Sequence, residues 1–238
     1  MTDSREQLDL NTADLRILQP DPLQPSPDEV EHYVVALQAA CSKESANSDW
    51  IKREVWRQLQ LATYRTRHDL GEASETFNWI FYLGQTPENT VGFKPGMFCA
   101  VVGLGIANGS IQRLLQRWPV WQGKVWEPNG LRGYNILKRK YSAPIRTLWH
   151  GHKFEPLGRE ELLGLHFHTY LGPGFTDEGK EVLIVQYRGD ENPWFQTRML
   201  DEIVEVVPDI YLGKVITKVG SRYREILYFA NRSEELGL

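Results

Sequence analysis

The chain has 238 residues, of which 41% are hydrophobic, and a formal net charge of −4 at pH 7. This length suits one all-β domain with an appendage, and the acidic balance gives no electrostatic reason for a nucleic-acid or membrane-surface partner. The polar start has no apolar signal region, and no apolar run is long enough for a membrane span. With two widely spaced cysteines, Cys41 and Cys99, these features predict a cytoplasmic protein.

Residues 1–25 are polar and rich in proline, so we expect a mobile or surface-laid arm. Ser26-Pro27 then begins a helix, because serine caps helices and proline fits their first turn. A second helix should run from 48 to about 68 and end at Gly71. We expect residues 26–71 to form a helical hairpin. The barrel or another subunit must cover its apolar stripes, so a homodimer through these helices is one alternative.

From residue 75 the pattern changes to short strands joined by turns. They are predicted at 77–83, 96–106, 120–128, 133–141, 182–188, 199–207, 210–219 and 222–232. Asn129-Gly130 and Gly220-Ser221 are hairpin turns, and 110–118 is an amphipathic helix with its apolar residues inward. Sequential strands without crossover helices favour an antiparallel meander, and closure removes its edges. We therefore predict an α+β, mainly β fold, with residues 75–238 forming a lipocalin-like β-barrel.

The most distinctive stretch holds four of the six histidines as two His-x-His pairs, His150/His152 and His166/His168. On a strand, each pair projects both imidazoles to one face. If His150 faces His168, the pairs form a hairpin with its loop centred on Arg159. The same face carries Leu148, Phe154 and Tyr170, and the other carries Trp149, Leu165 and Phe167. We expect the histidine face to line the barrel interior and the other face to lie under helices.

Several short motifs resemble those of a known family. They are Trp121-Gln122-Gly123-Lys124, Leu200-Asp201-Glu202-Ile203, Tyr211-Leu212-Gly213-Lys214 and Tyr228-Phe229-Ala230. On these motifs, residues 120–238 resemble uncharacterised bacterial and cyanobacterial lipocalin-like (calycin) barrel proteins, distant relatives of the G-x-W-x-G family. The resemblance implies a barrel with an inner cavity for a small apolar ligand. It implies no catalytic residues.

We therefore predict that the protein binds a small apolar or amphipathic molecule in a barrel cavity. The expected ligand-binding residues are His150, His152, His166, His168, Tyr170, Phe154, Trp121 and Tyr187. The alternative is an enzyme that uses the cavity for cyclisation, isomerisation or hydrolysis, with histidine and tyrosine as acid–base groups. The four histidines also suit a transition metal such as zinc. A structural protein that docks by its helices is a third reading.

Other patterns point to weaker alternatives. The turn at 103–105 between a strand and a helix resembles a dinucleotide-binding turn, with Glu127 as its acidic residue, although no βα alternation follows. Asp201, Glu202 and Glu205 form a carboxylate group that suits acid–base work. A short segment that resembles single-stranded nucleic-acid binders contains Arg132, Lys138, Arg139, Lys140 and Tyr141.

Overall fold

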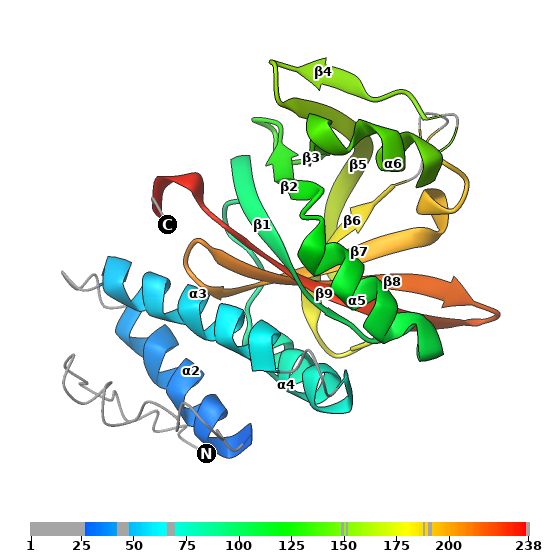
Figure 1. Cartoon of the computed structure of the whole chain (residues 1–238). Coiled ribbons are helices and arrows are strands. Elements are labelled where there is room, and N and C mark those ends of the chain that lie inside the picture. Colours follow the sequence, from blue (N-terminus) through cyan, green and yellow to red (C-terminus); the bar gives the residue numbers. More distant parts are fainter. Residues whose placement is uncertain are drawn as a thin grey trace.

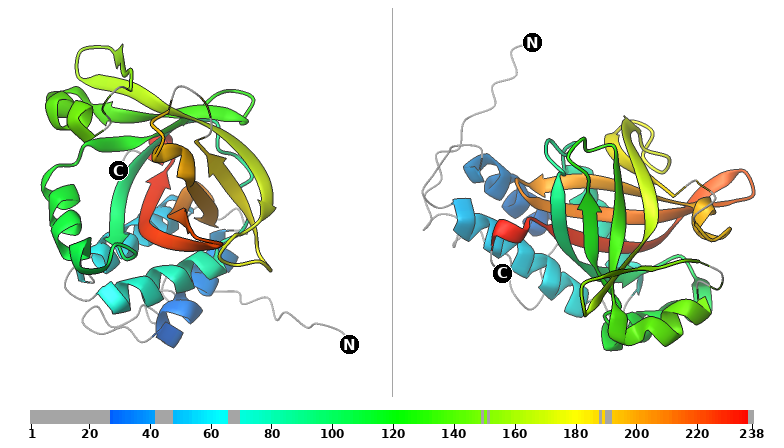
Figure 2. Two further views of the ribbon diagram at one scale, coloured as in Figure 1. Left: turned by 90° about the vertical axis from the view of Figure 1, so that its right-hand side faces the viewer. Right: turned by 90° about the horizontal axis from the view of Figure 1, so that it is seen from above.

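The computed structural model describes residues 27–41, 48–65, 70–148, 150, 152–187, 189 and 192–236. This part of the chain contains one sheet in which every pairing is antiparallel. Its strands are β1 (Gly92–Val101), β2 (Trp121–Trp126), β3 (Arg132–Lys138), β4 (Glu155–Leu157), β5 (Glu161–Pro173), β6 (Glu181–Gln186), β7 (Met199–Val207), β8 (Ile210–Val219) and β9 (Arg222–Arg232). The order is β3-β2-β1-β9-β8-β7-β6-β5, and β3 also pairs with β5. Eight strands thus close into a barrel (Figure 2), which confirms the predicted lipocalin-like fold.

Three helices, α2 (Pro27–Cys41), α3 (Ser48–Arg65) and α4 (Leu70–Leu83), pack on one outer side of this barrel (Figure 1). The first two are the predicted helices. The predicted strand at 77–83 is wrong, because these residues form the second half of α4. Ala73, Phe77 and Phe81 recur every four residues and are fully buried, which is the helical period.

The outer core lies between these helices and the barrel wall. Leu37, Ile51 and Leu59 from the helices meet strand residues such as Val204 and Leu212 in one buried cluster. Full burial of each such side chain stabilises the fold by roughly 1.5–3 kcal/mol. The chain's own barrel therefore covers these stripes, and the homodimer stays a prediction. Among the described helices, none has the length and apolar character needed to cross a membrane.

Strands β7, β8 and β9 begin and end at the predicted residues. Val219 pairs with Arg222 across the turn, as the turn chemistry predicts. Further along, a register shift makes Val215 pair with Leu227, whereas an unbroken ladder from this turn would pair it with Ile226. This bulge moves the following pairs of the hairpin by one residue.

The predicted histidine hairpin is only partly formed. Pro156 of β4 pairs with Leu162 of β5, so the loop centres on Arg159 as expected. The preceding residues do not continue as a strand, because 142–148 form helix α6 (Ser142–Leu148). Pro144 stands in its first turn, where a missing amide hydrogen costs the helix nothing. His150 and His152 follow this helix, and Trp149 and Gly151 lie outside the described residues.

The prediction that the histidine face of β5 points inward is wrong. His168 and Tyr170 are exposed, whereas Leu165 and Phe167 are buried in the barrel interior. Leucine and phenylalanine gain more from burial than histidine does, so they take the inner positions. The buried cluster beneath the helices contains no described residue of β5. This cluster therefore does not cover the outer face of β5.

Helix α5 (Asn108–Arg117) is also present as predicted, but its inward face is polar. Gln112 is buried, and its side chain accepts a hydrogen bond from the Val101 amide (2.7 Å) and donates one to the Cys99 carbonyl (3.1 Å). Since β2 pairs with β1 only at 92–95, this side chain satisfies strand backbone that β2 leaves free. Leu114 and Trp118, predicted to point inward, are exposed.

Candidate functional site

Strand β2 brings two unlike side chains to the inner wall of the barrel. Trp121 and Lys124 are three residues apart, yet both are buried, because the register with β3 shifts between Trp121 and Gly123. Gly123 has φ +143°, and a Cβ atom there would lie 2.2 Å from the carbonyl oxygen of Lys94. Only glycine fits this bulge. The W-x-G-K motif therefore places an indole and an ammonium group together inside the barrel.

Lys124 is the centre of a buried polar cluster that we call the interior network: Lys124, Asn135, Tyr187 and Asp201. The Lys124 Nζ lies 2.7 Å from Oδ2 of Asp201 and donates to the Tyr187 hydroxyl at 2.5 Å. That hydroxyl donates to the same Asp201 oxygen at 2.7 Å. Lys124 also donates to Oδ1 of Asn135 at 3.2 Å, and Trp121 Nε1 donates to the same atom at 2.9 Å. All three ammonium donors are therefore used.

Aromatic rings surround this network. The Lys124 Nζ lies 5.2–5.7 Å from the ring centres of Trp121, Phe167, Tyr187 and Phe229. Burial lowers the pKa of Lys124, and the charge of Asp201 opposes this shift. Burial, reinforced by Asp201, raises the pKa of Tyr187 well above its ordinary value. A dry cluster with shifted titration is typical of functional sites, although structural ion pairs also produce it.

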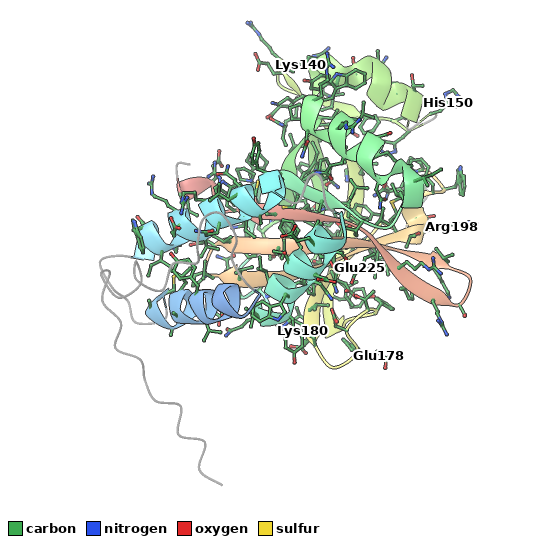
Figure 3. All side chains as sticks on the ribbon, turned by 60° about the horizontal axis from the view of Figure 1, so that its bottom comes forward. Lys140, His150, Glu178, Lys180, Arg198 and Glu225 are labelled. Atoms are coloured by element: carbon green, nitrogen blue, oxygen red, sulfur yellow. The ribbon has the colours of Figure 1, made fainter. Side chains whose placement is uncertain are left out.

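A pocket of about 600 Å³ lies along the segment that joins α6 to β4, and we call it the mouth pocket. Its lining residues are Arg146, His150, His152, Lys153, Phe154, Glu155 and Pro156. Figure 3 shows His150 beside the end of α6, away from Glu178 and Lys180. Phe154 is partly buried and also packs against the interior aromatic cluster. Phe154 therefore belongs both to the pocket wall and to the surface of the interior cluster.

A β-bulge in β5 joins the mouth pocket to the interior network. The Leu165 amide donates to Nε2 of His152 at 3.2 Å, and its carbonyl accepts from Nδ2 of Asn135 at 3.0 Å. Leu165 has φ +53°, an uncommon value for a residue other than glycine. A Cβ atom on Gly164 would lie 2.6 Å from the Phe154 ring, so glycine lets the pocket rings lie on the strand. Hydrogen bonds thus lead from the pocket to Lys124.

The structure divides the predicted ligand-binding residues into three groups. His150, His152 and Phe154 line the mouth pocket, Trp121 and Tyr187 lie in the barrel interior, and His166, His168 and Tyr170 lie on the outward side of β5. Their roles in binding stay predictions. Within the described residues, no group of three or more His, Cys, Asp or Glu side chains could hold a metal ion. The four histidines therefore do not form the transition-metal site that was considered as a possibility.

The three predicted carboxylates occupy separate surroundings. Asp201 belongs to the interior network, whereas Glu202 lies 3.7 Å from the buried Lys214 on the outer wall. Glu205 accepts the Asp209 amide at 2.8 Å, and burial raises its pKa. They do not form one acid–base group.

The other weak alternatives fare differently. The dinucleotide reading is wrong, because β1 and β2, on either side of that turn, are antiparallel and the described sheet has no parallel pair. In the basic segment, Tyr141 packs partly against the interior cluster. A role of this segment in nucleic-acid binding stays untested.

Sequence reasoning missed six residues of the site: Lys124 and Asn135 in the interior network, and Arg146, Lys153, Glu155 and Pro156 in the mouth pocket. A signal for Lys124 was present, since the glycine of W-x-G-K marks a bulge that turns the lysine inward. No local sequence pattern predicts that Asn135, Arg146 or Lys153 belongs to the site. Their positions depend on the helix before β4 and on strand pairing.

No family model matches this chain, and no curated protein or solved structure matches it significantly. The resemblance to lipocalin-like barrel proteins therefore stays an expectation based on short motifs.

Proposed function

We propose that this protein binds a small amphipathic molecule in the mouth pocket of its barrel. The supporting observation is the pocket itself: its volume of about 600 Å³ lies within the roughly 300–1,000 Å³ typical of small-molecule sites. Its wall combines an aromatic ring, Phe154, with cationic and imidazole side chains. The lipocalin-like resemblance implies a ligand inside the barrel, whereas we place it in the mouth pocket.

We assign the interior network a structural role in the barrel wall and not a catalytic one. Its lysine, tyrosine and aspartate would suit proton transfer in a dry cavity, as the alternative enzyme function requires. However, the N–H donors of the Lys124 ammonium group are already engaged by Asp201, Tyr187 and Asn135. The Lys124 side chain is only 3% exposed. Because the polar atoms of Lys124 are engaged within the network, we infer that Lys124 stabilises the part of the barrel wall against which Phe154 packs. We therefore favour ligand binding over catalysis.

The test is a fluorescence titration with 1-anilinonaphthalene-8-sulfonate, an amphipathic probe that brightens in apolar surroundings. We expect saturable binding to the whole chain and weaker binding to Phe154→Ala, which removes the apolar wall. The matched control is Tyr170→Ala, which removes an exposed ring outside the pocket. Native mass spectrometry of the purified protein should also reveal a retained small molecule. Absence of saturable binding, or equal losses in both variants, would contradict the proposal.

A further inference from the structure

The mouth pocket carries an excess of positive charge on a chain whose net charge is −4. Arg146 and Lys153 line it together with two imidazoles, and Glu155 is its one carboxylate. Arg146, Lys153 and His150 are exposed, so an incoming molecule can reach them. The electrostatic potential of such a recess attracts anions.

Several lysines of the chain are neutralised by ion pairs. Lys52 pairs with Asp209 at 2.6 Å, Lys124 with Asp201 at 2.7 Å, and Lys214 with Glu225 at 3.2 Å. Arg146 and Lys153, in contrast, make no ion pair with any residue that the structure describes. Their charges are therefore available to a ligand.

The shape of the groups narrows the class of anion. A guanidinium presents a planar fork that matches a carboxylate or phosphate, and an ammonium adds a point charge. Phe154 and Pro156 offer an apolar surface in the same pocket. Glu155 lies on that wall too, and its charge would repel a ligand with several acidic groups.

We propose that the ligand is an anionic amphiphile with a single acidic head group. Arg146 and Lys153 hold its carboxylate or phosphate, and its apolar body lies against Phe154 and Pro156. This inference rests on the proposed function and adds the chemical class of the ligand to it.

Calorimetric titrations with four probes that share one alkyl chain test this assignment: decanoate, decyl phosphate, decanol and decylamine. We expect the two anions to bind about tenfold or more tightly than decanol, since each exposed charge pair strengthens binding by up to about fivefold. Decylamine should bind most weakly. Added salt should weaken the anions and leave decanol unchanged. Comparison of decanoate with decyl phosphate shows which head group the fork prefers.

In the double variant Arg146→Gln/Lys153→Gln, decanoate and decyl phosphate should bind no more tightly than decanol. Its matched control is Arg113→Gln/Arg117→Gln, which removes the same charge from exposed positions of α5. Equal binding of decanoate and decanol to the natural chain would overturn the assignment while the binding function stands. An anion preference that survives the pocket variant would overturn it as well. Failure of all four probes would instead remove the proposed function.

Discussion

Replacement of Lys124 by methionine tests whether the interior network is a coupled, buried ion pair. The substitution keeps an unbranched side chain of similar length and removes the charge. Asp201, which is 2% exposed, then keeps one hydrogen-bond donor from the network, the Tyr187 hydroxyl. Loss of one partner of a buried pair typically costs about 3–5 kcal/mol. For a chain of this length, that corresponds to a fall in melting temperature on the order of 10 °C.

Urea denaturation of Lys124→Met, followed by tryptophan fluorescence and by circular dichroism, measures this loss. The triple variant Lys124→Met/Asp201→Leu/Tyr187→Phe removes both charges of the pair and the Tyr187 hydroxyl that bonds to them. Since a buried pair replaced by apolar residues is often neutral or better, we expect it to recover most of the stability. A cost below about 1 kcal/mol for the single variant would refute the coupling. A triple variant as unstable as the single one would show that packing, not charge, sets the cost.

Three further changes have defined outcomes in the same denaturation assay. Gly123→Ala should cost at least about 3 kcal/mol, because the added Cβ meets backbone, whereas Gly105→Ala, which also has positive φ but open space, should cost only about 1 kcal/mol. His152→Ala leaves a backbone amide without its acceptor and should cost about 1–3 kcal/mol, against about 0.5 kcal/mol or less for the exposed His168→Ala; equal effects would contradict the bulge hydrogen bond. Burial raises the pKa of Cys99 from 9.0 to about 12, so the thiol ionises at lower pH in the unfolded chain than in the folded one. The free energy of unfolding should therefore fall by ~1 kcal/mol between values below pH 9 and pH 10. That loss should be smaller in Cys99→Ala, and a profile identical to the natural chain would contradict it.

Much of the fold could be predicted because the last third of the chain is locally consistent. Strands at 199–207, 210–219 and 222–232 are rich in β-branched and aromatic residues and are joined by short turns, so local patterns and global pairing agree. The segment 77–83 shows the opposite case. Its aromatic content favours a strand, but Phe77 and Phe81 continue the helical spacing of Ala73. Packing on the barrel decided the outcome, and propensity alone could not reveal it.

The site was less predictable, because bulges decide which side chains face inward. After its bulge, from Leu165 to Tyr170, alternation gives the correct split of β5 into two faces, yet it cannot say which face is inside. The bulges at Gly123 and at Gly164–Leu165 then change the alternation within single strands. A single register shift reverses the face of every later residue. Arg146 and Lys153 reach the pocket only because helix α6 replaces the predicted strand.

The pairing of β1 with β9 has a consequence for folding of the chain during its synthesis on the ribosome. Phe98 pairs with Phe229, so the two strands of this seam are about 130 residues apart in the chain. At a translation rate of roughly 5–20 residues per second, β9 is synthesised on the order of ten seconds after β1. During that time the open edge of β1 could pair with a neighbouring nascent chain. Helix α5, made directly after β1, already shields the other edge through Gln112. Translation speed between β1 and β9 should therefore influence the yield of folded protein.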